Sequence, residues 1–287
     1  MRVTDVTACG AARLHPLPVP VVGYIPDCQH KYYPKFFSRK ELFFRDLGFS
    51  RLVKNSAAMF VNARAVKDDL VRFFGADPAK VFAAPFAPVV NEAYLDAGVP
   101  DIAEKYRLPE RYFMISNQFW MHKDHPTAFR AFAGLGDKRV GLVCTGETSD
   151  YRNPAYMGEM ERLLRELGID GRVNIAGFIP KRDQIELMKR CAALVQPSLF
   201  EGGPGGGSTW EAVGLGVPCA VSDIPVNREI DSDSVTFFRA GDHGDLRDKM
   251  ERLLDAPKPR PTRDELVRRS AVNRRRYGAS LFEVVAG

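Results

Sequence analysis

Short apolar runs and amphipathic stretches alternate along most of this chain. The apolar runs have the length of single buried strands, and they are Val21–Ile25, Ala57–Asn62, Val81–Ala84, Tyr112–Ser116, Val140–Cys144, Val173–Ala176, Ala192–Gln196, Pro218–Val221 and Val235–Phe238. The stretches with helical periodicity are Ala65–Phe74, Pro126–Ala133, Met157–Leu167, Arg182–Lys189 and Leu246–Leu254. This alternation predicts an α/β protein whose parallel sheets are covered by helices on both faces.

Prolines interrupt the periodicity around Phe86–Tyr106, which favours a linker between two domains. The strands expected after the linker suffice for a complete doubly wound domain. Only three strands are expected before it, too few for a full Rossmann-like domain. We therefore expect an incomplete N-terminal domain over residues 1–95 and a second Rossmann-like domain over residues 96–265. A C-terminal helix over residues 266–287 is expected to pack back toward the N-terminal domain.

The composition is typical of a soluble globular protein, with 45% hydrophobic and 27% charged residues. No apolar run approaches the roughly 20 residues that a membrane-spanning helix needs. The N-terminus lacks the layout of a secretory signal. The cysteines are odd in number and scattered, which favours buried thiols in a reduced compartment, and they are Cys9, Cys28, Cys144, Cys191 and Cys219. These features predict a cytoplasmic protein.

The net charge is +5, and basic residues gather near the C-terminus. The arginines of this run are Arg263, Arg268, Arg269, Arg274, Arg275 and Arg276. Two interpretations stay open: a solvated helix face, or contact with an anionic membrane surface or a phosphate-bearing acceptor. Because zinc spacing, an aromatic RNA-binding motif and a long basic stripe are all missing from the sequence, nucleic-acid binding is not expected.

The glycine-rich stretch from Ser198 to Ala212 is the most informative part of the sequence. Its glycines let the backbone adopt positive φ and let a ligand approach bare N–H groups. Ser208 or Thr209 is expected to cap a helix, and such a helix start attracts anions. Carboxylates at both ends, Glu201 and Glu211, suit hydroxyl groups. The stretch therefore predicts a ligand that is part anion and part polyol, such as a nucleotide-sugar.

Polar residues also follow other strands of the second domain, at the edge where open α/β sheets bind ligands. Asn117 and Gln118 follow one strand, and Gly177 follows another. Lys123 precedes a helix that is expected to start at Pro126, so this lysine and the helix N–H groups are candidates for holding a diphosphate. An exposed loop lysine is the alternative.

Histidines and one aspartate give weaker signals. His122 and His125 are close in sequence, but a third ligand is missing nearby, so metal binding is not expected. His30 follows a strand and a turn, where a histidine is either hydrogen-bonded in a loop or part of a site. The aromatic run Tyr32–Phe37 is more typical of a core than of a sugar-stacking face. Asp223 is more typical of a helix N-cap than of a ribose ligand.

Several longer segments match a known pattern. They are Asn174-Ile-Ala-Gly-Phe-Ile, Gln196-Pro-Ser-Leu-Phe-Glu-Gly, Glu211-Ala-Val-Gly-Leu-Gly-Val-Pro-Cys-Ala-Val-Ser-Asp-Ile-Pro-Val-Asn-Arg-Glu-Ile, Phe119-Trp-Met-His-Lys-Asp-His, Tyr24-Ile-Pro-Asp-Cys-Gln-His and Tyr33-Pro-Lys-Phe-Phe-Ser. Over roughly residues 20–285 the chain resembles family 4 of the retaining glycosyltransferases, and the Lys123 segment is similar to mannosyltransferase-like members. The resemblance implies the GT-B fold of two facing Rossmann-like domains, here with the N-terminal domain incomplete.

The resemblance implies a retaining hexosyltransferase of polysaccharide biosynthesis. It would transfer a sugar, with mannose the leading candidate, from a nucleoside-diphosphate donor to a glycan or lipid-linked acceptor. GDP-mannose is the leading donor candidate. No metal or other cofactor is implied, because lysine, arginine and helix dipoles stabilise the leaving diphosphate. Peripheral contact with the inner face of a membrane is a further expectation.

The resemblance also assigns roles to residues of this chain. Lys123 would hold the diphosphate, Glu211 would bind the ribose, and Glu201 would contact the sugar. His30 would approach the sugar from the other domain. The resulting catalytic residues are His30 and Glu201. The donor-binding residues are Asn117, Lys123, Gly177, Phe178, Ile179, Glu201, Gly202, Gly203, Ser208, Thr209 and Glu211.

Three features depart from the family's pattern. Nine residues separate Glu201 from Glu211, two more than usual. Asn117 or Gln118 stands near the place of an arginine that usually assists the lysine. The first strands of the N-terminal domain are missing from the pattern, which suggests a fragment, a shortened gene product or a protein completed by a partner.

Three other functions stay open. The segment Gly203-x-Gly205-x-x-Ser208 nearly matches a dinucleotide-binding fingerprint, and Asp223 ends the next strand, as a nicotinamide enzyme would have it. The missing strands favour an inactive or partner-dependent fragment that binds nucleotide-sugars. A nucleotide-sugar epimerase of the same fold is the third.

Overall fold

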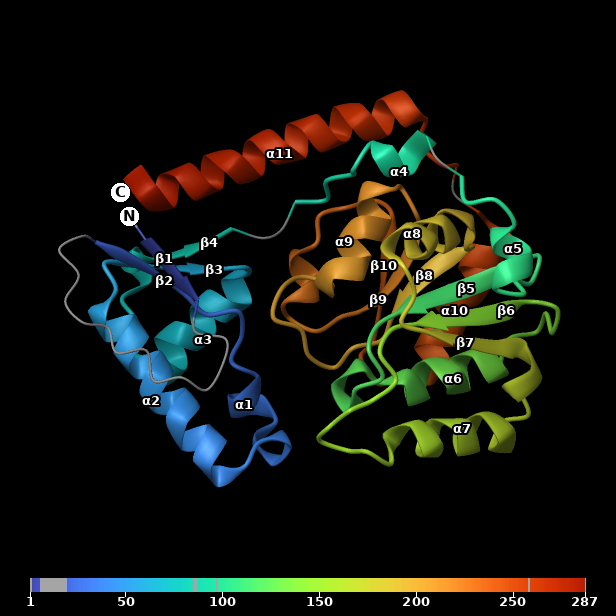
Figure 1. Cartoon of the computed structure of the whole chain (residues 1–287), viewed down its shortest axis with the longest axis horizontal. Helices are drawn as coiled ribbons and strands as arrows, with labels where there is room; N and C mark the ends of the chain where they lie inside the picture. Colours follow the sequence, from blue (N-terminus) through green and yellow to red (C-terminus); the bar gives the residue numbers. More distant parts are fainter. Residues whose placement is uncertain (1, 6–19, 85–86, 97, 258, 287) are drawn as a thin grey trace. The chain divides into compact units, whose positions relative to one another are not determined.

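The chain folds into two compact α/β units (Figure 1). The computed structural model describes residues 2–5, 20–84, 87–96, 98–257 and 259–286. The first unit takes in the residues up to Ala87, the stretch Glu201–Gly206 and the C-terminal part from Arg274. The second takes in Pro88–Phe200 and Gly207–Asn273.

The first unit is built on a parallel sheet with the strand order β1-β2-β3-β4. Its strands are β1 (Arg2–Asp5), β2 (Val21–Tyr24), β3 (Ala58–Val61) and β4 (Val81–Ala83). The sequence predicted three strands here and missed β1, because a four-residue segment with two charged ends carries little periodic signal. The expected three strands are therefore corrected to four.

The helices between these strands are α1 (Gln29–Tyr32), α2 (Arg39–Asn55) and α3 (Arg64–Phe74), with 3-10 turns at Pro34–Phe36 and Pro78–Lys80. Helices α2 and α3 pack on the sheet. Helix α2 was not predicted, although its start carries a capping box. The Ser38 hydroxyl accepts from the Glu41 N–H at 3.2 Å, and the Glu41 carboxylate accepts from the Ser38 N–H at 2.7 Å.

The second unit is built on a parallel sheet with the strand order β10-β9-β8-β5-β6-β7. Its strands are β5 (Tyr112–Ser116), β6 (Gly141–Thr145), β7 (Val173–Gly177), β8 (Ala193–Gln196), β9 (Cys219–Ser222) and β10 (Val235–Phe238). The chain builds one side of the sheet from β5 to β7 and then the other side from β8 to β10. This is the complete doubly wound arrangement that the sequence predicted, with its reversal between β5 and β8.

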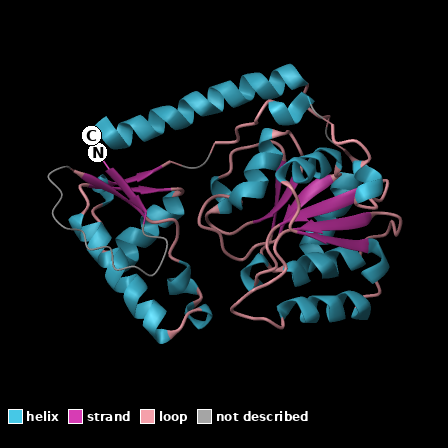
Figure 2. Ribbon diagram, viewed as in Figure 1, coloured by secondary structure: helices cyan, strands magenta, loops and turns pink. Residues whose placement is uncertain are grey.

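Helices lie on both faces of this second sheet (Figure 2). The helices from Pro88 onward are α4 (Ala93–Asp96), α5 (Ile102–Lys105), α6 (His125–Ala133), α7 (Tyr156–Glu166), α8 (Lys181–Arg190), α9 (Gly206–Gly214), α10 (His243–Asp255) and α11 (Arg263–Ala286). The 3-10 turns are Met121–Lys123, Asp170–Arg172 and Asn227–Glu229.

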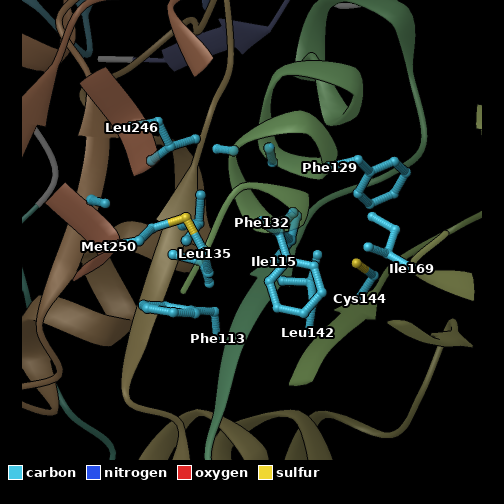
Figure 3. Packing of buried hydrophobic residues seen from close by; sticks show 14 of the residues in the cluster. Phe113, Ile115, Phe129, Phe132, Leu135, Leu142, Cys144, Ile169, Leu246 and Met250 are labelled. Carbon is cyan, nitrogen blue, oxygen red and sulfur yellow. The ribbon is translucent and has the colours of Figure 1, made fainter. Parts of the chain in front are cut away.

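The core of the second unit has two halves, one on each face of the sheet. Alternate residues of β5 point to opposite faces, so Phe113 and Ile115 belong to one apolar cluster and Met114 to the other. Figure 3 shows the first cluster, in which Phe113 and Ile115 pack with Phe132 of α6 and Leu142 of β6. Because both faces are covered, the strands are almost continuously apolar, which is why periodicity located them so well.

The segment predicted as a linker packs with the second unit from Pro88 onward. Val90 and Ile102 are buried in its core, at 5% and 1% exposure. These two side chains make the segment from Pro88 onward part of that unit. Phe86, the expected start of the linker, lies outside the described residues.

The cysteines at positions 28, 144, 191 and 219 are free and buried, and burial raises the pKa of each thiol. Cys9 lies outside the described residues. Among the helices that the structure describes, none is long and apolar enough to cross a membrane.

Candidate functional site

The carboxyl edge of the second sheet holds a polar pair at the reversal between β5 and β8. Asn117 follows β5 and Gln196 ends β8, and the Asn117 Nδ2 donates to the Gln196 Oε1 at 2.7 Å. Both side chains are buried. Ligands of open α/β sheets bind at such a reversal, so this pair marks the first place to look for a site.

Buried hydrogen bonds extend from this pair to β9. The Gln196 Nε2 donates to the Ser198 Oγ at 3.2 Å, and the Ser222 Oγ donates to the Ser198 carbonyl at 2.5 Å. The Asn227 Nδ2 donates to the Ser222 carbonyl at 3.0 Å. Since these buried groups satisfy one another, the backbone after β8 and β9 is held in place beside the reversal.

A pocket of about 340 Å³ opens at this edge, over the ends of β5, β6 and β7. Its lining residues are Ser116, Asn117, Gln118, Thr145, Gly146, Glu147, Phe178, Ile179 and Gln184. The Ser116 Oγ accepts from the Thr145 Oγ1 at 3.0 Å and from the Gln184 Nε2. The pocket therefore has an ordered polar floor.

Gly146 is required by the close approach of two strand ends in this pocket. Its φ is 137°, and a Cβ there would lie 2.1 Å from the Asn117 carbonyl oxygen. The Gly146 N–H donates to the Gly177 carbonyl at 2.8 Å, which ties the end of β6 to the end of β7. A side chain at position 146 would push these backbones apart.

Three predicted donor residues, Gly177, Phe178 and Ile179, follow one another at the rim and wall of the pocket. Gly177 ends β7 with φ 67°, which turns the chain toward α8. Ile179 is buried, whereas the Phe178 side chain is 84% exposed beside it. An exposed aromatic face next to main-chain polar groups suits a planar heterocycle.

Glu211 lies on α9 and makes an ion pair with Lys181, the first residue of α8. The Lys181 Nζ also donates to the Gln184 side-chain oxygen at 3.0 Å, which connects the ion pair to the pocket lining. The second carboxylate oxygen of Glu211 is buried and makes no hydrogen bond to the described residues. This oxygen is therefore a buried hydrogen-bond acceptor whose donor is missing among the described residues.

The start of α9 differs from the prediction. The helix begins at Gly206, so Ser208 and Thr209 lie inside it and neither is its N-cap. Gly205 and Gly206 have φ of 69° and 64°, which only glycine adopts readily, and they make the turn into the helix. Both predicted caps are buried, with hydroxyls that find no hydrogen-bond partner among the described residues.

Lys123 is a buried cation at the end of a 3-10 turn, two residues before α6 begins. Two buried histidines, His122 and His125, flank it in sequence. Burial, with Lys123 contributing, lowers the pKa of each histidine to about 3. The His125 ring stacks on Phe119 with centroids 4.1 Å apart. Both histidines are therefore neutral at pH 7, which leaves Lys123 as the cation of this segment.

His30 lies in the first unit, on α1, and is 2% exposed. Its Nε2 lies 3.0 Å from an Asp46 carboxylate oxygen, and its Nδ1 is buried without a hydrogen-bond partner among the described residues. Burial lowers the pKa of His30 and outweighs the opposing effect of Asp46. The ring packs edge-on against Phe49, with centroids 5.1 Å apart.

Glu201, Gly202 and Gly203 group with the first unit, whereas Lys123 and Glu211 belong to the second. Glu201 is buried at 8% exposure. A Cβ at Gly202 would lie 2.8 Å from the Pro26 carbonyl oxygen, so this backbone packs closely on the segment after β2.

Asp223 was expected to be a helix N-cap and is not one. The next helical turn is Asn227–Glu229, and its N-cap position is Val226. The Asp223 carboxylate instead accepts from the Ala240 N–H at 3.0 Å and from the Arg228 guanidinium at 3.1 Å. Across the part of the chain that the structure describes, no three His, Cys, Asp or Glu side chains are grouped to hold a metal ion.

Sequence reasoning missed several residues of this site. Ser116, Thr145 and Gln184 line the pocket, and Lys181 pairs with Glu211. Ser116 ends one predicted strand and Thr145 directly follows another, so their position was the available signal. Gln184 and Lys181 lie in the first turn of α8, and nothing in the sequence showed that this turn faces α9.

The family model described as glycosyl transferases group 1 matches residues 100–271, more than half of the chain. The O-antigen chain mannosyltransferase RfbU of Salmonella typhimurium is 22% identical over 233 residues, which are 81% of this chain and 60% of that protein. The chain thus spans less than two thirds of this curated relative.

Solved structures share the fold. Anabaena HepE in complex with UDP and glucose superposes with a TM-score of 0.72 at 16% identity, covering 93% of this chain and 71% of that one. WaaG, a glycosyltransferase involved in lipopolysaccharide biosynthesis, gives a TM-score of 0.65 at 16% identity, covering 92% and 74%. The two parallel-sheet units match those of these GT-B glycosyltransferases, as the sequence predicted.

Proposed function

Because the chain belongs to the glycosyl transferases of group 1, we propose that it transfers a sugar from a nucleoside-diphosphate donor to a glycan or lipid-linked acceptor. The pocket at the carboxyl edge of the second sheet carries this proposal. It places the exposed ring of Phe178 beside a floor of polar side chains, and the ion pair of Lys181 with Glu211 is connected to its lining through Gln184. The ring suits a base, and the carboxylate suits the ribose hydroxyls.

The nucleoside is assigned to the pocket itself. The base lies against Phe178 and the main chain of Gly177 and Ile179, and the ribose hydroxyls donate to Glu211. The unpartnered Glu211 oxygen supports this role, because a ribose hydroxyl supplies the missing donor. Lys181 makes an ion pair with the other oxygen of Glu211, so this ion pair has to break or be shared when the ribose binds.

The diphosphate and the sugar are assigned to the surrounding residues. Lys123 neutralises the diphosphate as its bond to the sugar breaks, with Asn117 beside it, and no metal is required. The glycine turn before Ser208 and Thr209 supplies N–H groups. Glu201, Gly202 and Gly203 bind the sugar hydroxyls. His30 contacts the sugar during a transfer that retains the anomeric configuration.

Two similar proteins favour different sugar donors. The Salmonella relative is named a mannosyltransferase, which favours GDP-mannose. The Anabaena structure holds UDP and glucose, which favours a uridine donor. We rank GDP-mannose first, because the Phe119–His125 segment is similar to mannosyltransferase-like sequences.

A thermal-shift screen of nucleotide-sugars, followed by calorimetry, tests the proposal. A ligand that binds only the folded protein raises its stability in proportion to occupancy. We expect stabilisation by GDP-mannose above other nucleotide-sugars and no effect of NADH. Stabilisation by NADH with no response to any nucleotide-sugar would overturn the proposal.

Replacing Glu211 tests the ribose assignment. Glu211→Ala is expected to weaken nucleotide binding by about 1–3 kcal/mol, because the ribose hydroxyls lose their acceptor. Glu166→Ala, at an exposed helix end of the same unit, is the matched control and should bind as the unmodified protein does. Equal affinities of the two variants in calorimetry would contradict the role of Glu211.

A further inference from the structure

The floor of the carboxyl-edge pocket holds a small network of side-chain hydrogen bonds. A lysine ammonium can only donate, so the Gln184 side chain offers its oxygen to the Lys181 Nζ at 3.0 Å. The Gln184 Nε2 therefore points the other way and donates to the Ser116 Oγ. The Ser116 Oγ also accepts from the Thr145 Oγ1 at 3.0 Å, so both of its lone pairs are in use.

One hydroxyl hydrogen is left over in this network. Ser116 and Thr145 each supply one O–H group, and the bond between them uses only one of the two hydrogens. The Ser116 O–H finds no acceptor among the described residues, and if the two hydroxyls exchange roles the spare hydrogen passes to Thr145 beside it. Both side chains are buried, at 8% and 2% exposure. The pocket floor therefore offers a hydrogen-bond donor to a ligand.

Glu147 supplies the opposite kind of group in the lining of the same pocket. Among the described residues that line it, Glu147 is the one with a formal charge. Its Oε1 accepts from the Ser149 N–H at 3.1 Å and from the Ser149 hydroxyl at 3.0 Å. These bonds lower the pKa of Glu147, so the side chain is a carboxylate at pH 7. A carboxylate has about four lone-pair sites, and this exposed one keeps acceptor capacity for a ligand.

The main chain fixes Glu147 beside Phe178. The Gly146 N–H donates to the Gly177 carbonyl at 2.8 Å, and Glu147 and Phe178 are the next residues of these two segments. The Glu147 carbonyl accepts from the N–H of the fully buried Phe119 at 2.8 Å, which anchors this rim. A base that stacks on the exposed Phe178 ring therefore meets the spare hydroxyl of the floor and the carboxylate of the rim.

A hydroxyl donor next to a carboxylate distinguishes the common bases by the order of their polar groups. Guanine presents the O6 carbonyl followed by N1–H and N2–H₂, which complements a donor followed by an acceptor. Uracil presents a carbonyl, an N–H and a second carbonyl, so the second carbonyl would face the carboxylate. Adenine and cytosine present an amino group to the hydroxyl donor and a ring nitrogen acceptor to the carboxylate. Guanine alone matches at every position.

We propose that Glu147 determines the choice of base, accepting from the N1–H and N2–H₂ of guanine while the hydroxyl pair of Ser116 and Thr145 donates to O6. This inference rests on the proposed function, because it takes the pocket as the nucleoside site. It favours a guanosine donor over a uridine donor through the chemistry of the pocket itself. A wrong base brings a carbonyl or a ring nitrogen against the carboxylate, and this repulsion adds to the selectivity.

Calorimetry of the full chain with purine nucleotides tests which base edge the pocket recognises. GDP, IDP and ADP have rings of the same size, so stacking on Phe178 changes little among them. IDP lacks only the N2 amino group and should bind about tenfold more weakly than GDP, because one hydrogen bond to a charged acceptor is lost. ADP has the reversed pattern and should bind more weakly than IDP. Equal affinities for GDP and IDP, or tighter binding of ADP, would overturn the proposal.

Glu147→Gln tests the residue itself. The variant keeps the size of the side chain and removes its charge, so it should bind GDP about tenfold more weakly and lose the preference for GDP over IDP. Ser149→Ala is the control, because it removes one hydrogen bond to the carboxylate and keeps the carboxylate, and its ratio of GDP to IDP affinity should stay unchanged. If Glu147→Gln weakened GDP and IDP by the same factor, Glu147 would only hold its loop, which contradicts the proposal.

UDP separates this proposal from the proposed function. UDP that binds more tightly than GDP, with an affinity that Glu147→Gln leaves unchanged, would refute the role of Glu147 and leave nucleotide-sugar transfer in place. Absence of binding by every nucleoside diphosphate would overturn both. Circular dichroism and thermal denaturation of each variant establish that the losses do not come from unfolding.

Discussion

The second sheet has a hollow at each of its two edges, and the larger one is not the candidate site. At the carboxyl edge, the pocket of about 340 Å³ is lined by Asn117, Gly146 and Phe178 among others. At the amino edge, where β6 and β7 begin, a hollow of about 460 Å³ is lined by Arg107, Arg139 and Arg172 among others. Size and positive charge alone would favour the amino edge for an anionic ligand.

The partners of the charged groups reverse that preference. At the amino edge, Arg139 makes an ion pair with Asp137, and Arg172 donates to the Val140 carbonyl and stacks over the Phe132 ring. Arg139 and Arg172 therefore already have partners within the fold. At the carboxyl edge, one Glu211 oxygen has no hydrogen-bond partner among the described residues, and Phe178 is exposed. A binding site is therefore distinguished more by polar groups that lack partners than by the volume of the hollow.

Lowering the pH is expected to have the largest effect, and this effect arises from two histidines near the carboxyl edge. His122 and His125 lie near the carboxyl edge with pKa values lowered to about 3 from 6.5, whereas histidine is not among the residues that line the amino-edge hollow. Below pH 6.5 the unfolded chain binds protons that the folded chain does not bind. The free energy of unfolding should therefore fall with decreasing pH from 6.5 to about 3, by about 1.4 kcal/mol per pH unit for each histidine.

Urea denaturation at a series of pH values measures this loss. His125→Phe keeps the stack on Phe119 and removes one titrating ring, so its pH slope should be shallower. A slope that His125→Phe leaves unchanged would contradict the buried neutral state of His125.

Matched glycine substitutions give the next largest effect. Gly146→Ala should destabilise the fold by about 2–4 kcal/mol and abolish nucleotide binding, because its Cβ would meet the Asn117 carbonyl at 2.1 Å. Gly171→Ala, at the amino edge, has open space around its Cβ and should change stability by less than about 0.5 kcal/mol. Thermal denaturation and calorimetry measure both. Equal changes in stability and in nucleotide binding in the two variants would contradict the assignment of the site to the carboxyl edge.

Removing Lys181 should have the smallest effect. The Lys181 side chain is 47% exposed and that of Glu211 29%, so their ion pair contributes at most about 1 kcal/mol. Lys181→Ala should strengthen nucleotide binding a few-fold, since the ribose no longer competes for Glu211. Weaker binding in calorimetry would instead show that Lys181 itself holds the nucleotide.

Much of the fold could be predicted from the sequence, and the reason is burial. Strands covered on both faces, such as Tyr112–Ser116, read as continuous apolar runs, so the order of the strands after Pro88 followed directly. The short helices α4 and α5 were not predicted. Strand β1 and helix α2 were missed. The first is short and polar at both ends, and the second was marked only by the capping pair Ser38 and Glu41.

The site was predictable where it depends on strand ends and less so where it depends on helix placement. Asn117 and Gly177 were placed correctly at the carboxyl edge, because parallel strands end at a common edge. The start of α9 was misplaced at Ser208 or Thr209, since cap preferences do not weigh a glycine turn. The ion pair of Lys181 with Glu211 joins residues far apart in sequence, and only the packed helices show it.

Hydrogen–deuterium exchange with GDP and, separately, UDP tests the central claim most directly. If the carboxyl-edge pocket binds the nucleotide, the ligand should slow amide exchange at residues 116–118, 145–147 and 177–179. Exchange at residues 107–109, 139–141 and 171–173, around the amino-edge hollow, should stay unchanged. Protection confined to the amino edge, or tight nucleotide binding with no protection around Gly146 and Phe178, would contradict the account.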